Sequence, residues 1–463
     1  MPHTCLRAPA IAGFMGLLLT VVAHGAAPPA DTPRAYDAAE REMLRLTNAA
    51  ADARTGWRKM ETFEITANDI RRSGRNFDWW NPLWHERSYA ASTRYGDIIA
   101  PPFFLSTLAG AGLDMVVVPG VGRWSGANDG GMWELYQPLE PGDVVRVWQE
   151  RPAITDVTAG NGPRSFHIDT TWVFVNQHNE RVAAFTSFLT NSFATTAGGT
   201  SGSGAAGGPG GAGPGAGGPP PGGASPPPGG AGPPPGAPAG GGGPAWLAGR
   251  ERIKYSAEDW KHIDALAHQE VIRGAKIRYW EDVGVGEETA PVIAEPTTVL
   301  DMIKVGGDIV MSIPPLREMP RELGKELSQD DYGVYHNLVE GHFTPLNSAT
   351  SMHFMAFGEN VMARLVTNWM GDDGWMRRFD ASHRTADARI RRSKLLATKQ
   401  IVGGHGVGGD AVIAHAEVVR KYVEGGEHLV DLVVWTESLR GQVWQTATAT
   451  VKLLSREDPA AWK

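Results

Sequence analysis

DWWNPLWHERSYAASTRYGDIIAPPFFLSTL, residues 78–108, is the stretch that decides the fold of this chain. Its first eight residues bring together an acid, an amide, three tryptophans, a proline and a histidine. Pro82 fixes its own backbone and disfavours helix at Asn81, so a turn is predicted that presents the neighbouring side chains. One or two helical turns are expected over residues 86–95, with Gly96 at the C-terminal position.

The apolar run that follows is expected to form a buried helix. Proline is tolerated in the first turn of a helix, where its missing N–H would have no helical partner, so Pro101-Pro102 fits a helix start. The side chains behind it cover every side of such a helix: Phe103, Phe104, Leu105, Leu108 and Ala109. The N-terminus of a buried helix offers unpaired N–H groups and the positive end of the helix dipole.

Three parts of this stretch resemble a known family. They are N-P-L-W at Asn81–Trp84, Y-A at Tyr89-Ala90, and G-x-I-I-A-P-P-x-F-L at Gly96–Leu105. Together they resemble the N-terminal domain of the MaoC-like acyl dehydratases of the fungal fatty-acid-synthase type. The stretch is also similar, more distantly, to the D-x-N-P-x-H signature of the R-specific enoyl-CoA hydratases. The resemblance implies an α+β double hot-dog fold, in which each half wraps a curved antiparallel sheet around a central helix.

The resemblance also implies a reaction, the addition or removal of water across the α,β bond of an acyl-CoA or another acyl thioester. That chemistry needs a carboxylate, an imidazole and donors for the enolate oxygen. By resemblance, Asp78 would activate water, His85 would exchange the α proton and Asn81 would fix the loop. N–H groups near Ala100 to Phe103 would hold the thioester oxygen. The side chains expected to bind substrate are Trp80, Ala100, Pro101 and Phe103.

The acid and the histidine are displaced from the signature of the hydratases. D-x-N-P-x-H places them where Trp79 and Trp84 stand in this chain, and Asp78 and His85 each lie one residue outside. Two interpretations follow: a widened loop that still turns both groups inward, or a lapsed site whose aromatic side chains fill the pocket. Two other functions therefore stay open, a hot-dog acyl-CoA thioesterase and a non-catalytic acyl- or lipid-binding protein.

The chain of 463 residues is long enough for two domains with full cores. We predict an N-terminal hot-dog domain over residues 36–195 and a C-terminal one over 246–458. Between them, residues 196–245 are rich in Gly and Pro and cannot bury enough surface to offset chain entropy, which predicts a disordered linker. An internal repeat supports the doubling, because residues 172–189 and 433–450 align without gaps as strand, turn and strand.

Periodicity predicts the other elements that matter here. Helices are expected over residues 38–53 and 353–366, the second being the best candidate for the second central helix. Strands are expected on either side of the turn at residues 140–143. Thr66, with Asp69 three residues on, is expected to cap a helical turn. A further strand is expected to carry Arg389, Arg391, Arg392 and Lys394.

Composition excludes several classes of function. The formal net charge is -8 and the basic residues form no extended patch, so nucleic acid is not an expected partner. The single Cys5 excludes a disulfide framework, a thiolate zinc site and an iron-sulfur cluster. No metal site is expected, and no cofactor beyond the CoA that forms part of the substrate. Related proteins often pair, so a homodimer is an option.

The first 30 residues leave the cellular location of the protein open. An apolar run over residues 8–23 precedes small residues at 25–27, which resembles a secretory signal peptide. The run is short and interrupted by glycine, so no stable membrane anchor is expected. An acyl-CoA substrate instead favours the cytoplasm, with a true start downstream, near Met43. We therefore expect a cytoplasmic protein and keep export to the periplasm as the alternative.

Overall fold

The fold is taken from a computed structural model, which describes residues 34–106, 117–118, 122–194, 254–294, 296, 328–329, 335–336, 355–403 and 410–458. The linker expected at 196–245 lies outside these residues. In the N-terminal half, antiparallel strands form a sheet in the order β1 (Gly56–Glu64), β4 (Val144–Gln149), β6 (Arg164–Val175), β7 (Arg181–Ala194) and β3 (Gly122–Leu135).

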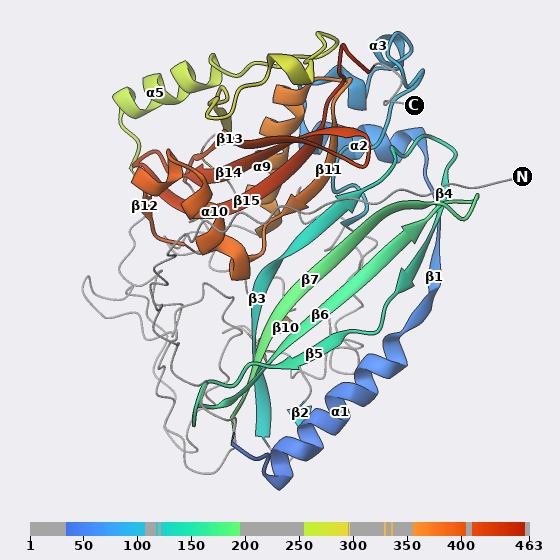
Figure 1. Ribbon diagram of the computed structural model, residues 1–463, viewed down its shortest axis with the longest axis vertical. Helices are drawn as coiled ribbons and strands as arrows, with labels where there is room; N and C mark the ends of the chain where they lie inside the picture. Colours follow the sequence, from blue (N-terminus) through green and yellow to red (C-terminus); the bar gives the residue numbers. More distant parts are fainter. Residues whose placement is uncertain are drawn as a thin grey trace, which may run out of the picture.

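The C-terminal half continues the same sheet. Its strands follow in the order β11 (Trp375–Asp380), β15 (Gln442–Lys452), β14 (Glu427–Glu437), β13 (Val412–Glu424) and β8 (Val292–Ala294). The two halves meet where β3 pairs antiparallel with β11, in a register that places Trp133 opposite Phe379. Figure 1 shows the N-terminal strands in blue to green and the C-terminal strands mainly in orange to red as two parts of one curved layer.

The strand order repeats between the halves, and this repeat establishes the fold. Each half has its first described strand, β1 or β8, at the outer edge, and β3 or β11 at the seam. Between these edges, β4-β6-β7 in one half corresponds to β13-β14-β15 in the other. The repeat found in the sequence falls on the hairpins β6–β7 and β14–β15. The predicted α+β double hot-dog fold is therefore confirmed.

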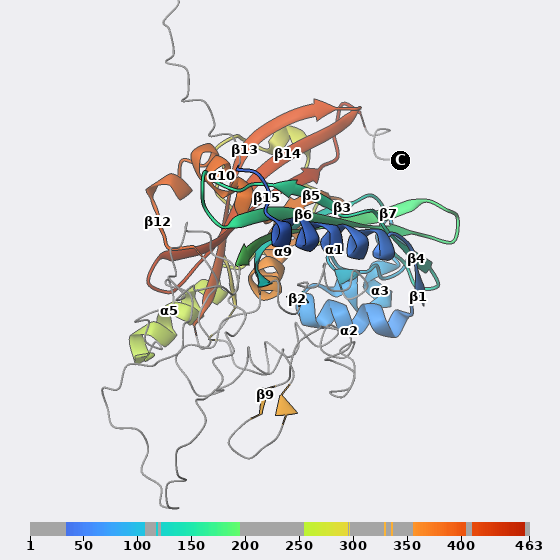
Figure 2. The same ribbon diagram turned by 90° about the horizontal axis from the view of Figure 1, so that it is seen from below.

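The second central helix is α9 (Met355–Met370), as the apolar spacing predicts. It lies against β13, β15, β8, β14 and β11, and Figures 1 and 2 show it in the hollow of the C-terminal sheet. Val361, Met362, Leu365 and Val366 are buried along it. The helix ends at Gly371, whose φ of 74° is a conformation that favours glycine. The equivalent helix does not start at Pro101 as predicted: residues 101–105 form a turn in which Phe103 has a φ of 64°, and the first helical residue is Ser106. The rest of that predicted helix, from residue 107, lies outside the described residues.

Two helices cover the N-terminal sheet. α1 (Ala38–Arg54) begins with a capping box and packs Met43 and Ala51 on Phe166 and Ile168 of β6. α2 (Ala67–Phe77) begins with the Thr66 capping box that the sequence predicts. It lies near α9, so it approaches the seam between the halves.

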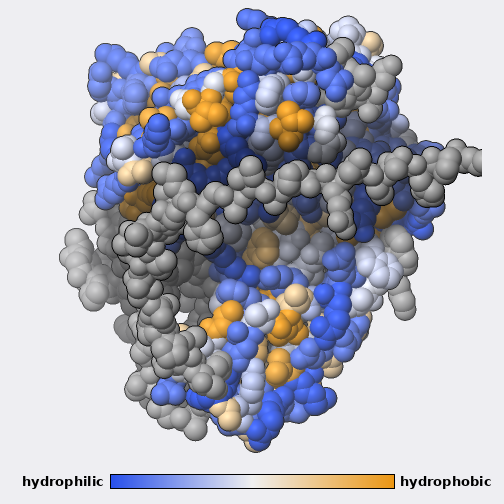
Figure 3. Space-filling view, viewed as in Figure 1, coloured by the Kyte–Doolittle hydropathy of each residue, from blue (hydrophilic) through white to orange (hydrophobic). Residues whose placement is uncertain are grey.

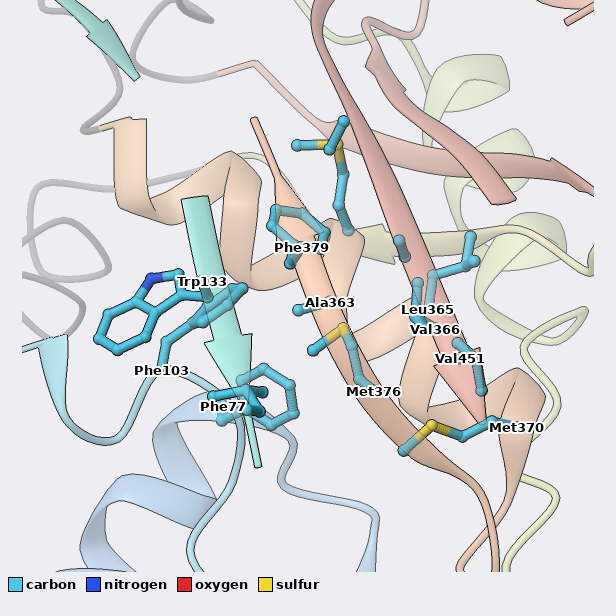
Figure 4. Close-up of a cluster of buried hydrophobic side chains, with 14 of the residues drawn as sticks. Phe77, Phe103, Trp133, Ala363, Leu365, Val366, Met370, Met376, Phe379 and Val451 are labelled. Carbon is cyan, nitrogen blue, oxygen red and sulfur yellow. The ribbon is translucent and has the colours of Figure 1, made fainter. Parts of the chain in front are cut away.

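One apolar core spans the seam. Figure 4 shows Phe103, Trp133 and Phe379 meeting beside side chains of α9. The Phe103 ring centroid lies 5.7 Å from that of Trp133 and 5.1 Å from that of Phe379. Residues that are adjacent in space therefore come from both halves. On the face in Figure 3 the described surface is mostly hydrophilic, and among the described residues no helix is long and apolar enough to cross a membrane.

Over residues 86–95 one helical turn forms, α3 (Arg87–Ala90), in agreement with the one or two turns predicted. The Ser92 and Thr93 hydroxyls then bond to the carbonyls that would continue the helix. One further local prediction was wrong. The expected strand of arginines is the helix α10 (Ala386–Arg392), in which Arg389 is buried. The strands predicted on either side of residues 140–143 are present as β3 and β4. They do not pair with each other, because the sheet order places them on opposite sides of β6–β7.

Candidate functional site

The predicted turn at Asn81-Pro82 exists and shapes a polar elbow, residues 78–85. α2 ends where the Asp78 N–H donates to the Gly74 carbonyl, at 2.8 Å. The Asn81 side-chain oxygen accepts the Leu83 N–H at 3.1 Å and starts a single 3-10 turn, η1 (Pro82–Trp84). The elbow passes so close to α2 that a Cβ on Gly74 would lie 2.4 Å from the Trp84 Cβ. Asn81 thus fixes the loop, as expected.

Asp78 is fully buried and faces charged groups of the C-terminal half. Its Oδ1 accepts the Trp80 N–H at 3.1 Å and lies 3.5 Å from Arg364 Nε. Among the described residues its Oδ2 has no hydrogen-bond partner. Burial raises the pKa of Asp78, and the nearby Arg364 guanidinium opposes that rise. Asp78 is therefore a proton-binding group held in a defined position.

Arg364 also binds a second carboxylate. Its Nε and Nη2 donate to Glu270 Oε1 at 3.0 and 2.6 Å, and Asn368 Nδ2 donates to the same oxygen at 2.8 Å. Burial raises the pKa of Glu270, while Arg364 lowers it and the Asp78 charge raises it further. Asp78, Glu270, Arg364 and Asn368 therefore form one polar cluster, which we call the carboxylate-arginine cluster.

His85 does not join this cluster through a described hydrogen bond. Its Nε2 lies 3.0 Å from the Trp79 carbonyl oxygen, and the side chain is partly exposed. Trp79 and Trp80 point outward, with 58% and 68% of their surface exposed. The predicted substrate-binding residue Trp80 therefore stands on the protein surface in this structure.

An apolar cavity of about 40 Å³ lies between the elbow, the end of α9 and the seam strands. Four of the residues expected from the sequence line it: Asn81, Ala100, Pro101 and Phe103. Trp84 lines it too, whereas Asp78, His85 and Trp80 do not. Residues close to Asp78 do line it: Asn81 follows Asp78 on the elbow, and Thr367 lies between Arg364 and Asn368 on α9.

Few N–H groups at the cavity are free to bind an oxyanion. The Ala100 N–H donates to the Leu139 carbonyl at 2.9 Å, and Pro101 and Pro102 have no N–H. Of the segment from Ala100 to Phe103, this leaves the amide of Phe103, a residue with an unusual φ of 64°. Trp84 Nε1 is a second donor, since it is buried without a hydrogen-bond partner among the described residues.

A second acid at the cavity was missed by the sequence reasoning. Asp372 lines the wall just after α9, and its Oδ2 accepts the Tyr89 hydroxyl at 2.6 Å. Burial raises the pKa of Asp372 and raises the pKa of Tyr89 to about 12. Gly274 leaves room for this contact, because a Cβ there would lie 2.9 Å from the Tyr89 hydroxyl. A signal was present: G-D-D-G directly after an apolar helix places acids at its buried end.

No group of three or more His, Cys, Asp or Glu side chains could hold a metal ion within the part of the chain that the structure describes. The site instead combines an apolar cavity, the buried carboxylate Asp372 in its wall, the buried carboxylate Asp78 on the adjoining elbow, and two candidate donors. Such an arrangement can bind an acyl group and exchange protons beside it.

Comparison with known proteins finds a family model that matches the part of the chain containing the elbow. Residues 53–185, which include the elbow, match the family model described as "FAS1-like, dehydratase domain region". The match agrees with the predicted resemblance of this part of the chain to a dehydratase domain. Residues 53–185 are therefore similar to a dehydratase domain.

No curated protein matches the chain. Solved structures that are similar include a "MaoC-like dehydratase", 12% identical, which covers 87% of this chain and 99% of its own with a TM-score of 0.48. A MaoC-like dehydratase from Rhodospirillum rubrum is 18% identical over 30% of this chain and 90% of its own, with a TM-score of 0.24. A conserved hypothetical protein from Mycobacterium tuberculosis with a double hotdog fold is 8% identical over 88% and 99%, with a TM-score of 0.41.

Proposed function

We propose that this protein is an acyl-CoA hydratase or dehydratase, which adds or removes water across the α,β bond of the thioester. One observation carries the proposal: a buried carboxylate, Asp78, keeps one oxygen without a described partner on the elbow whose residues Asn81 and Trp84 line an apolar cavity. The cavity would receive the acyl group, and Asp78 would handle the proton of the water.

The other residues take the roles that the sequence resemblance implies. Asn81 holds the elbow through its bond to the Leu83 N–H, and by the resemblance His85 at its end would exchange the α proton. The Phe103 amide and the Trp84 indole N–H would stabilise the thioester oxygen as negative charge develops on it. Hydrogen-bond donors in a site that excludes water stabilise such a charge more than the same donors do in water. CoA enters only as part of the substrate.

The test is hydration of crotonyl-CoA by Asp78→Asn. Removal of a general acid-base group typically lowers turnover 10²- to 10⁴-fold, so a loss of about that size is expected in the decay of enone absorbance. Asp431→Asn is a matched control, because Asp431 is also buried and its Oδ2 accepts from Arg392 at 2.9 Å in the C-terminal sheet. Full activity of Asp78→Asn would remove Asp78 from this role, and release of free thiol would indicate a thioesterase.

A second candidate function is acyl binding without turnover. It is favoured by the position of Trp84, which lines the cavity while Asp78 and His85 do not. If this function holds, crotonyl-CoA and longer thioesters would bind by calorimetry, and neither enone absorbance nor thiol content would change with time. Turnover by the wild type that is lost in Asp78→Asn would rule it out.

The proposed reaction implies a cytoplasmic location, since acyl-CoA is a cytoplasmic substrate. A homodimer also belongs to the proposal, and sedimentation of the full chain would show a species of twice the 49.7 kDa mass. A cleaved, exported form would contradict the cytoplasmic part of the proposal.

A further inference from the structure

The carboxylate-arginine cluster joins the two halves of the chain at the candidate acid. Asp78 comes from the elbow, Glu270 follows the helix α5 (Ala257–Ala267), and Arg364 and Asn368 lie one turn apart on α9. The side chains of Asp78, Glu270 and Arg364 are only 0%, 10% and 16% exposed. The environment of Asp78 is therefore built by residues of the C-terminal half.

The charges in this cluster do not balance. Asp78 and Glu270 would carry two negative charges when ionised, against the single positive charge of Arg364. The remaining titratable group that acts on Asp78 is His85 on the elbow, which is partly exposed. A buried, uncompensated charge is costly, and two interacting acids in such a place share a proton before both ionise.

The hydrogen bonds indicate where such a proton is needed. Within the described residues, two buried acceptor atoms of the cluster lack a donor, Asp78 Oδ2 and Asn368 Oδ1. Every hydrogen bond that Arg364 makes to the cluster goes to Glu270, whereas its contact with Asp78 is a longer 3.5 Å. Glu270 therefore holds the arginine more tightly, and Asp78 is the acid left with a free oxygen.

We propose that Arg364 and Glu270 are positioning residues which, from the C-terminal half, set whether Asp78 is ionised at the N-terminal site. Arg364 favours the ionised carboxylate through its positive charge, and Glu270 opposes it by competing for that charge. The proposal rests on the proposed function in one respect only, that Asp78 accepts the proton of water. The hydroxyl oxygen then bonds to the β-carbon, and a proton returns to the α-carbon, so no net proton is gained or lost.

The two variants of the Arg364–Glu270 pair should act in opposite directions. Glu270→Gln removes the competing negative charge, so Asp78 ionises at lower pH and the acid limb of the kcat-pH profile moves down. Arg364→Met removes the attraction, so the acid limb moves up. Shifts of about 1 to 3 pH units are expected, the range that a neighbouring charge produces. If Arg364 and Glu270 only supported the fold, both variants would lose activity without a shift of the acid limb.

Glu287→Gln is the matched control. Glu287 Oε1 accepts from Arg278 Nη1 at 2.8 Å, in a second partly buried Arg–Glu pair that also contacts α9 through Trp369. It lies outside the carboxylate-arginine cluster, so the variant should lose stability while keeping the acid limb of the wild type.

A second measurement reports the ionisation of Asp78 directly, without any turnover of substrate. In full-length protein labelled with ¹³C at the Asp carboxyl carbons, the Asp78 signal is the one missing from Asp78→Asn, and its titration midpoint should fall in Glu270→Gln and rise in Arg364→Met. Midpoints that stay in place, or move in the same direction, would overturn the inference. Failure of the proposed function looks different: the midpoints would move as stated while Asp78→Asn hydrates crotonyl-CoA at the wild-type rate.

Discussion

Tyr89→Phe should weaken the contact between the halves by about 2 kcal/mol. The Tyr89 hydroxyl donates to Asp372 Oδ2 at 2.6 Å, a length typical of hydrogen bonds to a carboxylate, and it is the one side-chain donor to Asp372 among the described residues. Hydrogen bonds to charged groups contribute about 1.5–3 kcal/mol, and loss of the only donor leaves a buried acceptor unsatisfied. Asp372 is 5% exposed, so water cannot easily replace the hydroxyl.

Tyr36→Phe provides the comparison within one half. Tyr36 donates to Asp156 over the same 2.6 Å, but Asp156 also accepts from Arg164 at 2.9 Å and from the Thr158 N–H. Its carboxylate keeps partners when the hydroxyl is removed, so a smaller loss of about 1 kcal/mol is expected. The assay is urea unfolding followed by tryptophan fluorescence. A loss below about 0.5 kcal/mol for Tyr89→Phe, or one no larger than that of Tyr36→Phe, would refute the reasoning.

Three further predictions concern pH, packing and the oxyanion donor. Burial raises the folded-state pKa of Glu270 above its ordinary 4.5, so ionisation of Glu270 destabilises the folded state. Glu270→Gln should therefore gain stability relative to wild type as pH rises above about 4.5. A constant difference in the free energy of unfolding between about pH 4 and 8, measured with urea, would count against this. Gly74→Ala should lower the free energy of unfolding by about 1–3 kcal/mol and weaken thioester binding, since the added Cβ would lie 2.4 Å from the Trp84 Cβ. An unchanged affinity in calorimetry would argue against that packing. Trp84→Phe keeps an aromatic ring in the cavity wall but loses the unpartnered indole N–H. The kcat for crotonyl-CoA should therefore fall about tenfold or more, while the midpoint of urea unfolding changes little. An unchanged kcat would exclude the indole as a donor.

The elements that depend on short-range chemistry could be read from the sequence. The capping box at Thr66, the turn at Asn81-Pro82 and the apolar spacing of α9 each involve residues within a few positions of one another. The doubled architecture was also readable, because the two copies of the strand-turn-strand repeat carry the same pattern of apolar and polar residues. The strand predicted to carry the arginines was wrong, since these residues form the helix α10. The basic residues there stand close together and have no apolar periodicity that distinguishes a strand from a helix.

The site itself depended on the tertiary structure. The sequence placed Asn81, Ala100, Pro101 and Phe103 at the cavity, since the elbow and the Pro-Pro segment lie close together in the chain. It could not place Asp78 opposite Arg364, because that contact joins positions far apart in the chain through the pairing of β3 with β11.

The amino-acid sequence by itself thus determined the resemblance of the N-terminal half to a dehydratase domain, the doubling and the polar elbow, because local backbone preferences and apolar periodicity act over a few residues. Only the tertiary structure decided which charges face the acid and which carboxylate lines the cavity, because Coulomb interactions and burial depend on distance in space and not on distance along the chain.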